Sequence, residues 1–103
     1  VNTGEIKVSS CGSLLHTGGI RTCIAVGIND GKNMILSHLT NEEDIFDLEN
    51  NLENLSNEKK TAKVWIGQNS TFDKSVTSFL KNNNINYQKN KVNYIDTVLY
   101  NCD

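Results

Sequence analysis

The chain contains a cysteine and a histidine of the types that serve as a nucleophile and its base. Cys23 lies in the apolar run TCIAVGI (residues 22–28), and His38 follows fifteen positions later in NMILSHL (residues 33–39). A cysteine nucleophile needs a base that takes its proton and a third group that orients that base. The pair therefore suggests nucleophilic catalysis, although a cysteine inside an apolar strand is more often a packing residue.

The segment NDGK (residues 29–32) connects the two apolar runs and is typical of a tight hairpin turn. A turn centred on residues 30 and 31 predicts that Cys23 lies directly opposite His38. Opposed residues share one face of a sheet, with Cβ atoms about 4.5–5.5 Å apart. We therefore expect the thiol and the imidazole to lie within contact distance.

The other histidine and cysteines are weaker candidates. His16 is a rival base, but its flanking leucines and glycines predict a loop position. Cys11 and Cys102 have no histidine in a comparable strand, and we interpret them as structural. An odd number of cysteines argues against a complete disulfide framework, so reduced thiols in a reducing compartment are expected. A Cys11–Cys102 pair stays open as an alternative, because chain ends often lie close together.

Six extended segments and two helices are expected to position these residues. The extended segments are residues 4–10, 22–28, 33–39, 61–67, 85–88 and 93–101. The glycine-rich stretch between the first two is expected to form turns. The first helix should begin with a capping box of Thr40 and Glu43. The second should be capped by Ser70 with Asp73.

Apolar residues at helical spacing mark the buried face of each expected helix. They are Ile45, Leu48, Leu52 and Leu55 in the first, and Phe72, Val76, Phe79 and Leu80 in the second. The element order β, β, β, α, β, α, β, β predicts an α+β domain. In it, a largely antiparallel sheet or sandwich is covered by two helices. The length of 103 residues suits one domain, residues 1–103.

The composition narrows the function classes. The hydrophobic fraction is 37% and the net charge is −2, as in an ordinary globular protein. The sequence has no stripe of lysine and arginine of the kind that binds nucleic acid, so we expect no nucleic-acid partner. No segment approaches the roughly 18 apolar residues of a membrane helix. The sequence contains no C-x-x-C pair and no histidine cluster, the patterns that are typical of zinc sites. We therefore expect neither a metal nor a cofactor.

The segment TGGIRTCIAV (residues 17–26) resembles the active-site segment of the CheD chemoreceptor glutamine deamidases. In that family a threonine six positions before the cysteine leads through a glycine-containing turn to the nucleophile and an apolar strand. The matching residues are Thr17, Gly19, Cys23, Ala25 and Val26. A histidine on the next strand, often followed by an apolar residue, completes the family's site, and His38 with Leu39 matches it.

The second half of the chain is also similar to CheD. KVWIGQN (residues 63–69) resembles the strand that leads into a Gly-x-Asn turn. TFDKSVTSFLKNNNINY (residues 71–87) resembles the helix that ends in an Asn-Ile or Gly-Ile stop. The resemblance covers the chain from about residue 4 to about residue 100, and it implies a CheD-like fold.

A similar Cys–His arrangement on an α/β sandwich occurs in deamidating bacterial toxins, namely the cytotoxic necrotizing factors and the Burkholderia lethal factor. The chain departs from CheD in three ways. Arg21-Thr22 stands where CheD usually has Gly-Ser, the usual proline soon after the histidine is absent, and the chain is shorter. These differences favour a divergent toxin or effector domain.

The resemblance implies a protein glutamine deamidase that converts glutamine to glutamate and releases ammonia. Cys23 is then the nucleophile, His38 the base and Thr17 the group that orients the imidazole. The substrate and its oxyanion are held around Gly18, Gly19, Arg21 and Thr22, and the partner is a protein that presents a glutamine side chain. The site is expected to work in a reducing cytosol, of the bacterium or of a host.

Three alternatives stay open. The chain is a chemoreceptor deamidase of the CheD type, another cysteine hydrolase, or a CheD-like binding module that has lost its activity. Arg21 bears on the last of these, because an arginine that fills the pocket would block catalysis.

Overall fold

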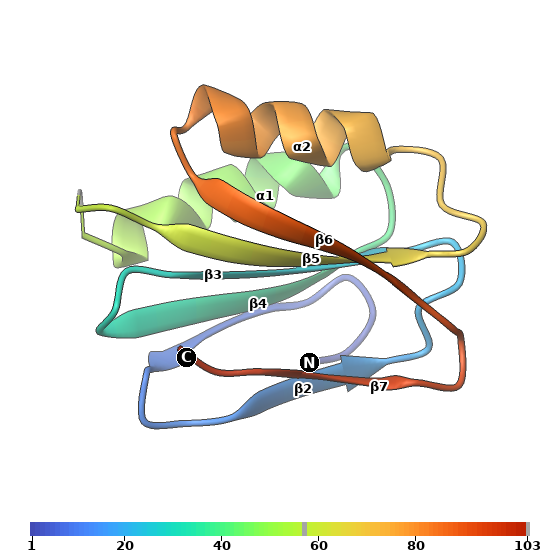
Figure 1. Ribbon diagram of the computed structural model, residues 1–103, viewed down its shortest axis with the longest axis horizontal. Coiled ribbons are helices and arrows are strands. Elements are labelled where there is room, and N and C mark those ends of the chain that lie inside the picture. Colours follow the sequence, from blue (N-terminus) through green and yellow to red (C-terminus); the bar gives the residue numbers. More distant parts are fainter. Residues whose placement is uncertain (57, 103) are drawn as a thin grey trace.

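The computed structural model describes residues 1–56 and 58–102, which form three layers (Figure 1). Two helices cover one face of a five-stranded sheet of order β1-β4-β3-β5-β6, and a two-stranded sheet, β2-β7, covers the other face. The strands are β1 (Ile6–Ser10), β2 (Leu15–Gly18), β3 (Ile24–Asn29), β4 (Asn33–Leu39), β5 (Thr61–Gly67), β6 (Asn86–Val92) and β7 (Thr97–Tyr100). The helices are α1 (Asp44–Asn51), a 3₁₀ turn (Leu52–Asn54) and α2 (Asp73–Asn82). The α+β class is therefore confirmed.

The five-stranded sheet is mixed. β1 pairs with β4, β4 with β3 and β3 with β5 in antiparallel fashion, whereas β5 and β6 are parallel. The parallel pair needs a crossover, which α2 provides. No helix within residues 1–56 and 58–102 is long and apolar enough to cross a membrane.

Strand β3 is buried on both faces, as its continuous apolar run predicts. Ile24, Val26 and Ile28 belong to the main core, which includes residues of both helices. The alternate side chains face β2 and β7, where Ala25 packs with Val98 of β7. This face of β3 carries the candidate site.

Strand β2 was not expected, because its sequence LHTG is short, ends in glycine and lies among turn residues. It forms by pairing with β7, with Leu15 opposite Tyr100 and Gly18 opposite Thr97. The pairing partner is about eighty residues away in the sequence, so the local pattern predicted turns where the structure has a strand.

Both helix starts differ from the predicted caps. The amide and the hydroxyl of Thr40 both donate to the Asp44 carboxylate at 2.6 Å, so the acidic partner is not Glu43. The side chain of Asn41 accepts the amides of the first turn instead. Helix α2 begins at Asp73 with no side-chain cap. Ser70 Oγ is buried without a hydrogen-bond partner among the described residues.

The end of α2 follows the expected Asn-Ile stop. Asn84 takes a left-handed conformation with φ 57°. The amide of Ile85 then donates to Leu80 O at 2.9 Å, which satisfies a carbonyl of the last turn. The predicted buried face of this helix is confirmed, since Phe72, Val76, Phe79 and Leu80 are all buried.

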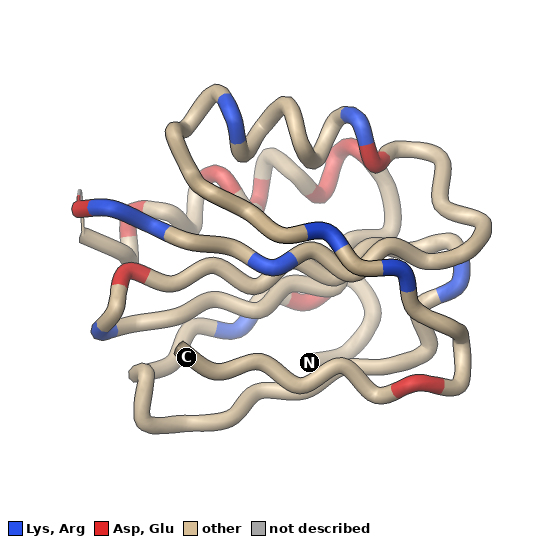
Figure 2. The backbone as a smooth tube through the Cα atoms, viewed as in Figure 1, with Lys and Arg blue, Asp and Glu red and all other residues tan. Residues whose placement is uncertain are grey.

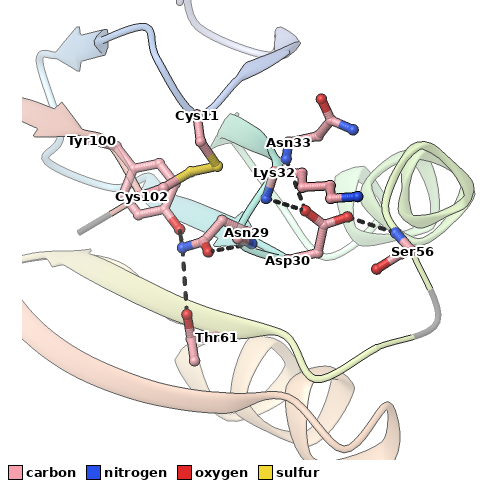
Figure 3. The surroundings of a disulfide bond; sticks show 10 residues. Cys11, Asn29, Asp30, Lys32, Asn33, Ser56, Thr61, Tyr100 and Cys102 are labelled. Atoms are coloured by element: carbon pink, nitrogen blue, oxygen red, sulfur yellow. Dashed lines mark hydrogen bonds between the residues drawn. A yellow bond between two sulfur atoms is a disulfide. The ribbon is translucent and has the colours of Figure 1, made fainter.

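A disulfide joins Cys11, which lies between β1 and β2, to Cys102, which follows β7 (Figure 3). The expectation that all three cysteines are reduced is therefore wrong, and the alternative pairing is the one that forms. The pairing of β2 with β7 brings the two residues together. Such bonds persist in oxidising environments. Cys23 is free and buried.

The charges are unevenly distributed over the layers (Figure 2). Helix α1 carries Asp44, Asp47 and Glu49, with no basic residue in its last turn. Lysines lie along the outer edge strand β6, at Lys89 and Lys91. Positive charge on an edge strand discourages pairing with another sheet.

Candidate active site

The β3–β4 hairpin places His38 directly opposite Ala25. The prediction that Cys23 is the opposed residue is therefore wrong. The reason lies in the turn, which is centred on residues 31 and 32 instead of 30 and 31, so that Asn29 pairs with Met34. The Asp30 carboxylate accepts the amides of Lys32 and Asn33 at 2.8 Å each and fixes this turn.

The corrected register keeps Cys23 on the same face of the sheet as His38. Cys23 directly precedes β3, and it packs in one small cluster with Ala25, the residue opposite His38. Diagonal neighbours across an antiparallel pair are about 7–8 Å apart. Cys23 and His38 are thus diagonal neighbours, and no hydrogen bond joins them in the described part of the chain.

Thr17 and His38 meet across the two sheets. Thr17 Oγ1 lies 2.8 Å from His38 Nδ1 and donates its own proton to Val1 O at 2.7 Å. Both side chains are almost completely buried, at 2% and 1% exposed. The predicted pairing of threonine with imidazole is present, and it depends on strand β2.

These two hydrogen bonds assign the tautomer of the imidazole. A hydroxyl has one proton, and that of Thr17 is used on a carbonyl, which can only accept. His38 Nδ1 must therefore carry a proton and donate it to Thr17. Nε2 then has a free lone pair, and it is buried with no hydrogen-bond partner among the described residues.

Burial also lowers the pKa of His38 below its usual 6.5, and the nearby Asp44 carboxylate opposes this shift only in part. The imidazole is therefore neutral near pH 7. A neutral imidazole with its lone pair on Nε2 can accept a proton from a thiol or from water. The N-terminal segment holds the backbone of His38 in place. The His38 amide donates to Glu5 O at 3.0 Å, and the Gly4 amide donates to His38 O at 2.9 Å.

The loop of residues 18–22 leads into Cys23 and is pinned at one point. Ile20 is completely buried, whereas the flanking residues are exposed. Gly19 has φ 68°, a conformation that glycine adopts without strain. Gly18, Arg21 and Thr22, predicted with Gly19 to hold the substrate, therefore lie on the accessible side of the loop.

Arg21 is exposed and packs against the loop that follows β6. Its guanidinium carbon lies 4.4 Å from the centre of the Tyr94 ring, in a cation–π contact at the surface. The Arg21 side chain therefore lies at the surface, whereas an arginine that blocks a pocket would be buried.

Gly67, at the end of β5, helps to fix the backbone at Cys23. Its amide donates to Cys23 O at 3.1 Å, and the Asn69 amide donates to Arg21 O at 2.8 Å. A Cβ at position 67 would lie 2.8 Å from Cys23 O, which is closer than side chains tolerate. A glycine is therefore required where this turn meets the cysteine loop.

Two contributors to the site were not singled out from the sequence. Trp65 lies opposite Ala25 on β5 and packs against the cluster that contains Cys23. Its ring meets that of Tyr100 edge-on, at 5.9 Å between centroids. The alternation of β5 could have placed Trp65 on this face, because Val64 and Ile66 face the helices. Nothing in the sequence marks Val1 as the acceptor for Thr17.

The remaining candidates lie elsewhere. His16 is exposed, and it neighbours buried Thr17 on β2, so its side chain lies on the opposite face. Within residues 1–56 and 58–102, no group of three or more His, Cys, Asp or Glu side chains could hold a metal ion. A cleft of about 370 Å³ lies at the end of β5. It is lined by Ile66, Gly67, Gln68, Ser70, Asp73 and Lys91.

No protein-family model matches the chain, and no curated protein sequence matches it either.

Proposed function

We propose that the protein is a glutamine deamidase of the CheD-like type, with Cys23 as nucleophile, His38 as base and Thr17 as the orienting residue. The observation that carries the proposal is the buried His38 Nε2, which lacks a partner among the described residues. Its lone pair is set free by the hydrogen bonds of Thr17, on the face of the sheet that bears the free thiol of Cys23. A buried nitrogen without a hydrogen-bond partner costs free energy, and a catalytic role is one explanation for its presence in a folded protein.

The resemblance to CheD supports the same three residues. Thr17 precedes Cys23 by six positions, and His38 lies on the next strand of the same hairpin. The layered α+β arrangement is compatible with a CheD-like fold. The short chain and the Arg21-Thr22 pair favour a toxin or effector domain over a chemoreceptor enzyme.

In the proposed reaction, His38 Nε2 takes the thiol proton, and Cys23 Sγ attacks the carboxamide carbon of a glutamine side chain. The tetrahedral intermediate collapses as His38 returns the proton to the leaving nitrogen, which departs as ammonia and leaves a thioester. Water then attacks the thioester and gives a proton to His38. That proton returns to the sulfur as glutamate is released.

The oxyanion needs donors held in place before the reaction. The backbone beside Cys23 offers such rigidity, because the carbonyls of Arg21 and Cys23 are tied to amides at the end of β5. The exposed glycines 18 and 19 leave room for a substrate side chain to approach the backbone. The apolar wall of Trp65 and Val98 around Cys23 limits the access of water.

Cys23 and His38 are diagonal neighbours, and the proposed reaction requires Sγ to approach Nε2 when substrate binds. Catalytic hydrogen bonds are often long or absent without substrate and tighten when it binds. Substrate is therefore expected to complete the pair.

The test is to incubate the protein with bacterial and host-cell lysates in water enriched in heavy oxygen. Glutamine-to-glutamate conversions are then sought by peptide mass spectrometry, together with released ammonia. Hydrolysis of a thioester incorporates one heavy oxygen atom into each new carboxylate. Cys23→Ser is the inactive control. Conversions that occur equally with this variant would overturn the proposal.

A CheD-like binding module without activity is the second candidate. It is favoured by the low exposure of Cys23, 9%, and by the absence of a described Cys23–His38 hydrogen bond. Alkylation by iodoacetamide separates the two. In an active site the rate at Cys23 falls when His38 is replaced by alanine, whereas in a binding module His38→Ala leaves it unchanged.

A further inference from the structure

Two loops lie side by side at the end of the molecule where the cysteine is located (Figure 1). They are residues 18–22, which run from the last residue of β2 towards β3, and residues 93–96, between β6 and β7. A methyl group placed on Gly18 would lie 3.5 Å from Asp96 O, and one placed on Gly19 would lie 3.7 Å from the Tyr94 ring. The two loops are therefore close neighbours, and their residues Arg21, Tyr94 and Ile95 are here called the rim.

The rim presents a positive charge on an aromatic platform. The guanidinium of Arg21 stacks on Tyr94, with 4.4 Å from Cζ to the ring centroid. A planar guanidinium that stacks on a ring keeps its N–H groups at the edge, where they can bind a carboxylate through two hydrogen bonds. No carboxylate among the described residues pairs with Arg21.

The residue after Tyr94 in the loop is a large apolar one, Ile95. Ile95 is 87% exposed and Tyr94 is 50% exposed, which is unusual for large apolar residues beside one another. Arginine and tyrosine are also the residue types that most often dominate the binding energy of protein interfaces.

Hydrogen bonds to the end of β5 and within the 93–96 loop hold the rim in place. The Asn93 amide donates to the Asp96 carboxylate at 3.1 Å, so this acidic group is engaged inside the loop. The side chain of Gln68, just after β5, donates to Asn93 Oδ1 at 2.5 Å. The Asn69 amide holds Arg21 O at 2.8 Å. A preorganised surface loses little entropy when it binds a partner.

We propose that the rim recognises a protein segment in which an acidic and an apolar residue flank the target glutamine. This inference rests on the proposed deamidase function, because it names the substrate class of that site. Arg21 lies only two residues before Cys23. A carboxylate bound by its guanidinium therefore belongs to a residue close to the glutamine.

The experiment measures binding separately from turnover. Fluorescent synthetic peptides with one central glutamine carry either Glu and Leu or Lys and Leu around it. Their binding to the Cys23→Ser protein is measured by fluorescence anisotropy. We expect the acidic peptides to bind about tenfold more tightly than the basic ones, as a charge-assisted hydrogen-bonded pair provides.

Charge reversal tests the role of Arg21. In the Cys23→Ser background, Arg21→Glu should reverse the preference, and Tyr94→Ala should weaken the binding of both peptide sets. Lys81→Glu, an equal charge change at the exposed end of α2, is the matched control and should leave the preference unchanged. Equal binding of the two peptide sets, binding of neither, or an unchanged preference in Arg21→Glu would overturn the proposal.

The two proposals fail in different ways. If the acidic preference reverses with Arg21→Glu but no protein or peptide is deamidated, the rim is a binding surface and the deamidase function is wrong. If deamidation occurs but the preference does not depend on Arg21, the function stands and the rim proposal is wrong.

Discussion

The imidazole of His38 and the hydroxyl of Thr17 lie 2.8 Å apart, although they belong to different sheets. His38 is on β4 of the five-stranded sheet, and Thr17 is on β2 of the two-stranded sheet. The tautomer of the proposed base is therefore set by how the two sheets pack together. A change that loosens β2 or β7 should reach the chemistry of the site.

Removal of the Thr17 hydroxyl should impair the proposed reaction. Thr17→Val keeps the shape of the side chain but loses the hydrogen bond to Nδ1, and the deamidation rate should fall about 10- to 100-fold, as the loss of one charge-assisted hydrogen bond would produce. Nitrogen NMR of His38 should show the proton no longer confined to Nδ1. Thr17→Ser should restore both the rate and the tautomer. An unchanged tautomer in Thr17→Val would contradict the assignment.

The folded protein should lose stability as the pH falls below about 6.5. The folded-state pKa of His38 is lowered by burial, so the unfolded chain binds its proton at a higher pH than the native state does. The contribution is complete above the unfolded pKa of about 6.5 and is lost as the pH falls through the folded pKa. Urea unfolding at several pH values measures it, and His38→Gln should flatten this part of the profile whereas His16→Gln should not.

The proposed activity should follow the same group. Deamidation requires neutral His38, so its rate should stay constant through neutral pH and decline only below 6.5, the ordinary pKa of histidine. An acid limb at or above that value would mean that the imidazole is not held neutral by burial in the working enzyme.

Loss of the disulfide should destabilise the fold. Cys11 and Cys102 are 91 residues apart in the sequence, and the bond restricts a large loop in the unfolded chain. Its removal by Cys11→Ser is expected to lower the free energy of unfolding by about 2–5 kcal/mol. Equilibrium unfolding in urea measures this, and the same loss should follow from a reductant in the wild type. Cys23→Ser keeps the disulfide and provides the matched control, because a reductant should lower its stability by the same amount as in the wild type.

A side chain at position 67 should disturb the cysteine loop. In Gly67→Ala the new Cβ would lie 2.7 Å from the carbonyl carbon of Arg21 and 2.8 Å from Cys23 O, both of which are backbone atoms. We expect a loss of about 1–3 kcal/mol in stability and a marked fall in Cys23 alkylation by iodoacetamide. Gly12→Ala has open space around its Cβ and should leave both quantities near the wild-type values.

Neutralising Asp30 should weaken the turn that sets the hairpin register. Partial burial raises the pKa of this carboxyl, but the amides of Asn33, Ser56 and Lys32 outweigh it and lower the pKa to about 2 (Figure 3). Its stabilisation is therefore present above pH 4 or so and lost as the pH falls through about 2. Because water screens the site, we expect Asp30→Asn to cost only about 1 kcal/mol in urea unfolding near pH 7, and nothing at very low pH.

Local sequence patterns were sufficient to predict the elements whose hydrophobic patterns are long and consistent. The apolar run of β3, the alternation of β5 and the helical spacing of α2 were each sufficient, because burial against any core requires them. The sequence also determined the residue types of the site, since a thiol, an imidazole and a hydroxyl are properties of Cys23, His38 and Thr17 themselves.

The positions of these groups relative to one another depend on how the strands pair and pack. The hairpin turn is displaced by one residue from its predicted centre, so His38 faces Ala25 and Cys23 becomes a diagonal neighbour. Strand β2 exists only through β7, and this pairing brings Cys11 to Cys102. The carbonyl of Val1 reaches Thr17 across the packed sheets. The pairing of β2 with β7, the Cys11–Cys102 bond and the Val1–Thr17 contact join distant parts of the chain, and local sequence patterns carry no information on such pairings.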